Sequence, residues 1–172
     1  RKLGNAIEFL QSELFWDSII TYYHDRYKGE SFNTFFWTIR TMLFPFINIL
    51  QHKPIQADIY HSVSTGYAGI LGVVFHEMTQ KPFLLTEHGI YAREREEEIL
   101  KASWVTGIYK KLWIDFFYFI SKAAYTEADQ IIALFERNQA IQRELGAPTE
   151  RTAIIPNGVD IDEYNLEKKE HD

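Results

Sequence analysis

Two short segments that combine histidine, hydroxyl and glycine residues carry the side chains with the clearest chemical potential. They are His61–Gly69 and Thr86–Gly89. Each follows a short apolar run and precedes a stretch with helical spacing, which is typical of a strand that leads into a helix. In an open α/β sheet, ligands bind at the carboxyl ends of adjacent strands. The two segments therefore predict one polar crevice at the end of a sheet.

The first segment places Thr65, Gly66 and Tyr67 at the start of a predicted helix. Exposed backbone N–H groups at such a position bind a phosphate or a sugar hydroxyl, and glycine permits close approach of a ligand or of backbone. The alternative is a tight strand–helix turn capped by Ser or Thr. The segment does not have the Gly-x-Gly-x-x-Gly fingerprint of dinucleotide-binding loops.

In the second segment, Glu87 and His88 are neighbours, so on an extended chain their side chains diverge and only one is expected to face the crevice. His88, directly before Gly89, is placed to donate a hydrogen bond to a sugar hydroxyl. The alternative is a structural histidine satisfied by backbone carbonyls. A third hypothesis is a metal-dependent hydrolase using His61, Glu87 and His88, although no spacing enforces a metal site.

The charged run Arg93–Glu98 is most simply the solvated start of a helix, because acidic residues favour the first turn and Glu94 and Glu98 lie four residues apart. A sharper hypothesis is that Arg93 or Arg95 faces the crevice and holds an anionic group.

Composition excludes several classes of function. The chain of 172 residues has 24 acidic and 18 basic residues, which argues against a nucleic-acid partner because phosphate binding needs a basic stripe. Cysteine is absent, so there is no disulfide framework, thiolate nucleophile or Cys-based zinc site, as fits a cytoplasmic protein. The most apolar stretch, Phe32–Leu50, contains Arg40 and Pro45 and predicts a buried helix pair; an interfacial helix is the alternative.

The pattern of apolar residues predicts an all-helical segment followed by an α/β unit. Helical spacing covers 2–27, and Ser31 is the expected N-cap of a second helix. Predicted strands at 57–62, 82–86, 128–133 and 152–155 alternate with predicted helices at 66–78, 93–104, 108–124 and 137–145, the last stopped by Gly146. Such alternation implies a parallel sheet with right-handed crossovers. The residues expected to face inward on two of these helices are Ala68, Leu71, Val74, Phe75 and Met78, and Ile108, Leu112, Trp113, Phe116, Phe117 and Ile120.

Five motifs in chain order resemble glycosyltransferase family 4, the retaining sugar transferases of the GT-B fold. They are ADIYH (57–61), TGYAG (65–69), PFLLTEHG (82–89), ADQII (128–132) and IIPNGVD (154–160). More narrowly, STGYAGILG (64–72), LTEHGIYARER (85–95) and LFE (134–136) resemble PelF-like proteins of the Pel exopolysaccharide branch. The resemblance covers 57–160, and residues 1–56 match no motif.

The resemblance implies a fragment with a helical segment at 1–56, a Rossmann-like acceptor-side domain at 57–155 and a hinge at 156–172 toward a C-terminal donor domain. It implies that the parent is a hexosyltransferase that extends an exopolysaccharide from a nucleotide sugar, expected to be UDP-glucose, with no metal or other cofactor. The isolated fragment is expected to be inactive. His88 matches the family histidine that contacts the transferred sugar and is the expected catalytic residue. The expected substrate-binding residues are Thr65, Gly66, Tyr67, Glu87, Gly89, Arg93 and Arg95.

A second hypothesis treats the chain as a binding module. Its crevice would hold a glycan or a partner, and residues 1–56 would dock it onto an inner-membrane export assembly, giving a cytoplasmic protein that associates with the membrane. The expected partners are thus a nucleotide sugar, a glycan acceptor and that assembly. An unpaired edge of the sheet also predicts self-association.

Overall fold

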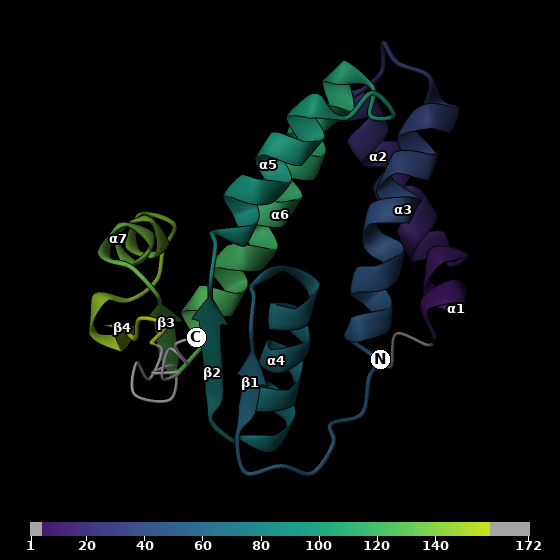
Figure 1. Cartoon of the computed structure of the whole chain (residues 1–172). Helices are drawn as coiled ribbons and strands as arrows, with labels where there is room; N and C mark the ends of the chain where they lie inside the picture. The colour runs from purple at the N-terminus through teal and green to yellow at the C-terminus, as the bar shows by residue number, and fades with distance from the viewer. Residues whose placement is uncertain (1–4, 159–172) are drawn as a thin grey trace, which may run out of the picture.

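The computed structural model describes residues 5–158, in which three helices precede a four-stranded parallel sheet with its own helices (Figure 1). This arrangement confirms the predicted α/β class. Val159 and Asp160 of the fifth motif, and the predicted hinge beyond Gly158, lie outside the described residues.

The N-terminal helices are α1 (Ala6–Leu10), α2 (Glu13–Arg26) and α3 (Phe32–Ile49). The prediction of continuous helical spacing over 2–27 is wrong at Ser12, whose side chain caps α2 by accepting a hydrogen bond from the Phe15 N–H. A serine side chain that bonds nearby backbone favours a new helix start over a helix interior.

The apolar stretch 32–50 forms one helix, and the predicted helix pair is therefore wrong. Helix α3 continues through Pro45, and Ser31 caps its start as expected. Buried side chains on both sides of the proline, Met42 and Ile47, anchor the two halves in one hydrophobic core. Among residues 5–158, no helix combines the length and apolarity that crossing a membrane requires.

The sheet consists of β1 (Tyr60–Ser62), β2 (Phe83–Glu87), β3 (Gln130–Ala133) and β4 (Thr152–Ile154), in the order β1-β2-β3-β4 with every pair parallel. The connecting helices are α4 (Gly66–Thr79), α5 (Tyr91–Lys101), α6 (Gly107–Glu127) and α7 (Glu136–Glu144), and a short 3-10 turn (Thr149–Arg151) precedes β4. Along β2 the side chains alternate between buried and half-buried, so the helices cover one face of the sheet more fully than the other. Strands β1 and β4 form the edges, and self-association through an edge stays a prediction.

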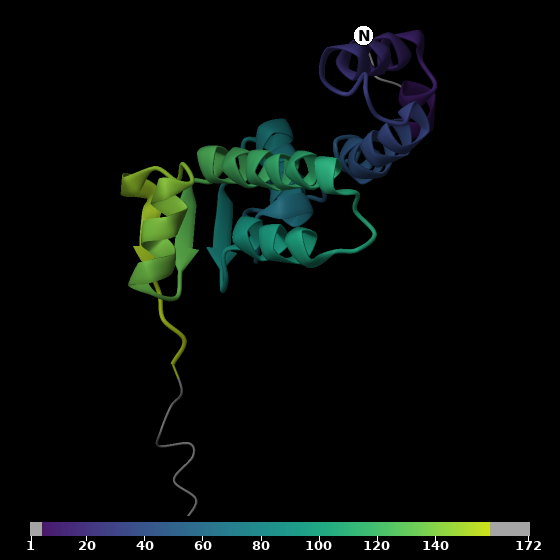
Figure 2. The ribbon, with the colours of Figure 1, turned by 90° about the horizontal axis from the view of Figure 1, so that it is seen from above.

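Two hydrophobic clusters hold these elements together. One lies between the sheet and helices α4 and α6, and the other joins α4, α5 and α6 to the N-terminal helices. Figure 2 shows α1–α3 extending away from the sheet, with α3 beside the amino-terminal end of α6. The two segments predicted on either side of residue 56 therefore share one hydrophobic core.

The inward face of α4 matches the prediction in part: Phe75 is buried as expected, and Leu71 and Val74 are half-buried against the core. Met78 is 59 % exposed and Ala68 is also exposed, whereas Gly66, Gly69, Ile70, Gly72 and Phe75 are buried. A Cβ at Gly72 would lie 2.3 Å from the Phe83 ring, so small residues set the face on which helix and strand approach closely. In α6 likewise, Ile108 is exposed and Tyr109 is buried, while the predicted inward positions Trp113, Phe116, Phe117 and Ile120 are confirmed.

Candidate functional site

The loops after β1 and β2 come together at the carboxyl end of the sheet, as the two chemical segments predict. The strands are neighbours and parallel, with Ser62 opposite Leu85. Gly66, with a φ of 57°, begins α4 directly against the Tyr91 ring that begins α5. A Cβ at Gly66 would lie 2.4 Å from that ring, so glycine is required both by the left-handed backbone and by the close contact.

Glu87 lies beneath this junction and is 1 % exposed. Its carboxylate accepts hydrogen bonds from the Thr65 hydroxyl at 3.1 Å and the Gln142 amide at 3.1 Å. It also accepts one from the Tyr125 hydroxyl and one from the Tyr91 backbone N–H. These donors come from the start of α4, the start of α5, from α6 and from α7, so one buried carboxylate ties four helices to the end of β2.

The low-dielectric surroundings of this network perturb its titration. Burial raises the pKa of Glu87, and the hydrogen bonds from Tyr125 and Gln142 only partly oppose that change. Burial, followed by the proximity of Glu87, also raises the pKa of Tyr125. The network extends to Ser121, whose hydroxyl lies 2.9 Å from that of Thr65. The predicted substrate contacts Thr65 and Glu87 are therefore buried groups that brace the crevice from within.

His88 lies on the opposite side of the chain and is exposed, as expected from divergent neighbours. Its backbone carbonyl accepts a hydrogen bond from the Asn138 side chain of α7 at 3.1 Å, which fixes the loop at its outer edge. Gly89 is half-buried, and the Glu94 carboxylate covers the position where a Cβ would lie. His88 is thus an accessible imidazole on a loop held from two sides.

The other side chains predicted to bind substrate do not point toward the His88 loop. The Tyr67 hydroxyl donates to the Met42 carbonyl of α3 at 3.3 Å, so this side chain faces the N-terminal helices. Arg93 pairs with Glu144 of α7 at 3.5 Å, whereas the Arg95 guanidinium lies 5.3 Å above the Tyr91 ring. The structure does not bring the two arginines together, and their roles in substrate binding stay predictions.

Sequence reasoning missed Asn138, Tyr125, Gln142 and Ser121, which complete the loop and the network. They lie on helices, 38 to 56 residues along the chain from the groups they bond, and no local motif marks them. The hydroxyls of Ser121 and Tyr125 on the apolar face of α6 are the one signal in the sequence, because a buried hydroxyl needs a partner.

The metal-site alternative is contradicted by the geometry. Strand alternation places His61, opposite Leu84 in the register, on the face of the sheet that does not carry Glu87. The His61 ring lies 2.9 Å from the Thr86 hydroxyl. Within the described part of the chain, no three His, Asp or Glu side chains are grouped so that they could hold a metal ion.

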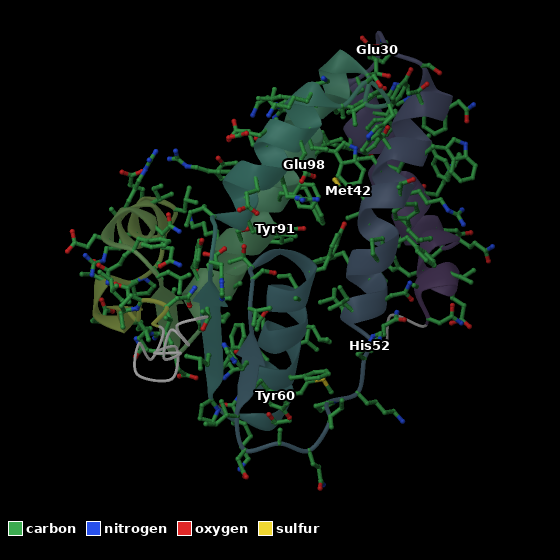
Figure 3. All side chains as sticks on the ribbon, in the orientation of Figure 1. Glu30, Met42, His52, Tyr60, Tyr91 and Glu98 are labelled. Carbon is green, nitrogen blue, oxygen red and sulfur yellow. The ribbon has the colours of Figure 1, made fainter. Side chains whose placement is uncertain are left out.

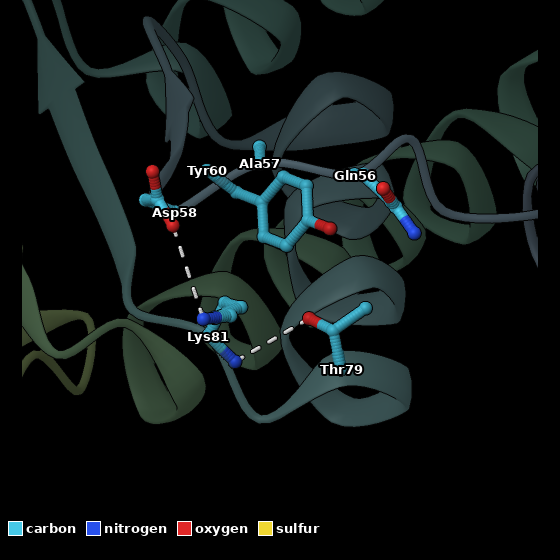
Figure 4. Close-up of a pocket in the computed structure, with 6 residues that line it drawn as sticks. All are labelled: Gln56, Ala57, Asp58, Tyr60, Thr79 and Lys81. Carbon is cyan, nitrogen blue, oxygen red and sulfur yellow. Dashed lines mark hydrogen bonds and ion pairs between the residues drawn. The ribbon is translucent and has the colours of Figure 1, made fainter.

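A cavity of about 450 Å³ lies at the other end of the sheet (Figure 4). Its lining includes Asp58 and Lys81, whose charged groups lie 3.9 Å apart, and Tyr60, whose hydroxyl donates to the Ile55 carbonyl. These residues precede or begin the first two strands, whereas ligands of open α/β sheets bind at the carboxyl ends. Position in the fold therefore favours the His88 loop over this cavity as the functional site.

Comparison with known proteins shows the family to which this chain belongs. No curated protein matches the chain. Residues 2–150 match the family DUF3492, described as a domain of unknown function, and this match covers well over half of the sequence. The chain therefore belongs to the DUF3492 family, a domain found in the N-terminal regions of glycosyltransferase-like proteins of family 4.

Proposed function

We propose that this chain is the acceptor-side part of a retaining, PelF-like glycosyltransferase that transfers a sugar from a nucleotide sugar, taken to be UDP-glucose, to a growing exopolysaccharide. Membership of a family found in glycosyltransferase-like proteins supports the reaction class. The observation that carries the proposal is the exposed His88 on a loop braced by the buried Glu87 carboxylate and by Asn138.

In this proposal, His88 donates a hydrogen bond to a hydroxyl of the transferred sugar as an oxocarbenium-like transition state develops. Such donors accelerate a reaction when they are already aimed at the developing charge, because no reorganisation is then needed. The four hydrogen bonds to Glu87 supply that rigidity beneath the loop. The remaining stabilisation comes from the departing phosphate and from groups of a donor domain, and no protein nucleophile is assigned.

The first prediction concerns His88→Ala in the full-length protein that contains this chain. We expect kcat for glucose transfer from UDP-glucose to fall by about 10²–10³-fold, the loss typical of one preorganised donor. We expect little change in the melting temperature, because the side chain is exposed. Initial rates with radiolabelled UDP-glucose and a thermal melt by circular dichroism measure the two effects.

The matched control is His52→Ala. His52 is also exposed, and it follows α3, away from the crevice (Figure 3). We expect its turnover to equal that of the unmodified enzyme. Equal turnover of the His88 and His52 variants would remove His88 from the site.

The second prediction concerns the 172-residue chain alone. If the nucleotide sugar is held mainly by a donor domain, this chain should bind UDP-glucose no more tightly than about 1 mM, or roughly 4 kcal/mol. It should also be inactive, because binding an acceptor alone does not stabilise the transition state. Isothermal titration calorimetry tests the affinity. A micromolar dissociation constant would place the donor site within these residues and contradict the proposal.

The second candidate function is a module that docks onto an export assembly through the N-terminal helices. Large aromatic side chains exposed on α2 and α3 favour it, with Trp16 49 % exposed and Phe44 38 % exposed. The same helices also contribute buried residues to the shared core. Deletion of residues 1–56 distinguishes the two roles. If the helices only dock the chain, the shortened chain should still fold; if they are part of the core, it should not.

A further inference from the structure

Three tryptophans gather where α3 meets the connection between α5 and α6. Trp104 is 71 % exposed and Trp37 is 54 % exposed, whereas Trp113 is buried. The rings of Trp104 and Trp113 lie edge to face, with their centroids 6.1 Å apart. Large apolar side chains are rarely exposed side by side on a protein surface, and tryptophan is enriched at binding sites. Exposed tryptophans on two facing elements therefore indicate a binding surface.

Two hollows flank the Trp104–Trp113 pair. The larger, about 260 Å³, lies between α3 and the connection, and its polar lining is made of threonines. These are Thr34, Thr38 and Thr41 on α3 and Thr106 on the connection. The smaller, about 150 Å³, runs along α5 and is lined by Arg95 and Glu98 beside Phe117. We call the two hollows together the tryptophan groove.

The polar groups of the groove have unused hydrogen-bonding capacity. Arg95 pairs with Glu98 through one terminal nitrogen, but its buried Nε finds no partner among the described residues. The Thr38 hydroxyl donates to the Thr34 carbonyl and keeps its lone pairs free to accept. The groove thus offers donors and acceptors beside indole faces.

We infer that the tryptophan groove binds a carbohydrate chain, at a site separate from the crevice around His88. A pyranose ring presents a face of C–H bonds and an edge of hydroxyls. The C–H face is attracted to the negative face of an indole ring. The hydroxyl edge matches threonine hydroxyls and an Arg–Glu pair, whose groups both donate and accept. A purely apolar ligand would leave these polar groups without partners.

A membrane surface fits this groove less well than a glycan does. Tryptophan is also enriched at bilayer interfaces, where cationic residues accompany it. Here Arg40 lies over the Trp37 ring, but Glu98 lies beside Arg95 in the smaller hollow and the chain carries a net charge of −6. The tryptophans moreover line hollows, and a bilayer surface would not enter a hollow to bury them.

The crevice lies at the start of α5, and the groove begins one turn along this helix, where Arg95 of the smaller hollow stacks on the Tyr91 ring, and extends past the end of the helix to Trp104. Tyr91 contacts Gly66 at the crevice, and the helix runs 11 residues to Lys101, or about 15 Å. Tyr91 and Glu98 mark this course in Figure 3, on the side of α5 toward α3. An acceptor chain held in the groove would reach the crevice along this helix. That the bound carbohydrate is the acceptor rests on the proposed function, whereas the inference that the groove binds carbohydrate does not.

The experiment is calorimetric titration of the 172-residue chain with cellohexaose and with chitohexaose. We expect binding of at least one, weakened about tenfold or more by Trp104→Ala and by Trp37→Ala, since each removes an aromatic stacking contact. Thr41→Val, which keeps the shape and removes one hydroxyl, should weaken binding by a smaller factor. Because Trp104 and Trp37 are exposed, circular dichroism should show folded variants.

Phe119→Ala is the matched control, because Phe119 is an aromatic residue of α6 that is 63 % exposed and does not line the groove. It should bind as the unmodified chain does. Failure of both oligosaccharides to bind at millimolar concentrations, or equal binding by the Trp104 and Phe119 variants, would overturn the inference. Trp104-dependent binding to phosphatidylglycerol vesicles without oligosaccharide binding would overturn it in favour of a membrane contact. His88→Ala should leave groove binding unchanged, so loss of transfer and loss of groove binding are distinguishable.

Discussion

Replacing Glu87 with alanine is expected to lower the free energy of unfolding by about 3–5 kcal/mol, well beyond the effect of an ordinary point substitution. The carboxylate is 1 % exposed and accepts four hydrogen bonds. Alanine would leave the buried donors of Tyr125 and Gln142 without their carboxylate partner and would open a cavity beside them, while the Thr65 hydroxyl keeps its contact with Ser121. Equilibrium unfolding in urea, followed by circular dichroism, measures the loss.

Glu87→Gln is the control, because it preserves the volume of the side chain and removes its charge. We expect a smaller loss than for alanine, since no cavity opens and the one amide oxygen still accepts from one of the two pairs of donors, Thr65 with Tyr91 or Tyr125 with Gln142. A loss with alanine no larger than about 1 kcal/mol, the usual effect of a point substitution, would mean that the network does not brace the site.

The unmodified chain and the Glu87→Gln variant should also differ in how their stability depends on pH. Burial raises the pKa of Glu87 above its ordinary value of 4.5, so the folded state binds a proton more tightly than the unfolded state does. Stability from this group is fully present below about pH 4.5 and is lost as the pH rises through the raised pKa. The unmodified chain should therefore lose stability relative to Glu87→Gln over that interval. A constant difference between the two across pH 4–8 would contradict the raised pKa.

Deleting residues 1–56 is the second change with a large expected effect, and we expect it to abolish cooperative folding. Phe35, Ile39, Met42 and Ile47 of α3 are at most 6 % exposed and belong to one core with α6. Burying such a side chain contributes about 1.5–3 kcal/mol, so four approach the total stability of an ordinary domain. The deletion would also expose apolar side chains of α6 that now face α3, including Phe116.

Thermal melts and binding of a hydrophobic dye report this outcome directly. The deleted chain should bind the dye and show no sharp transition, whereas the 172-residue chain should melt cooperatively. A deleted chain that folds cooperatively but no longer fractionates with membranes would instead support the docking module.

Much of the local structure follows from the sequence, because it depends on neighbours within a few residues. Strand-length apolar runs alternating with helical spacing predicted the parallel sheet, and Ser31 and Gly146 predicted where helices begin and end. Gly146 has the expected positive φ, 109°. The junction of the two chemical segments also followed, since adjacent parallel strands end at the same edge of a sheet.

The tertiary structure alone decided which polar residues are buried and which are exposed. The sequence presents Glu87 and His88 as equal neighbours, and the donors brought together from α4, α5, α6 and α7 explain why the carboxylate turns inward. Likewise, the close approach of α4 to Phe83 placed Gly72 on its inward face beside Phe75, and left Met78 exposed. The tryptophan groove joins residues around 37 to residues around 104, a separation over which no local spacing rule operates. Such contacts depend on how whole helices pack, because the free energy of burying a group is set by every element that surrounds it.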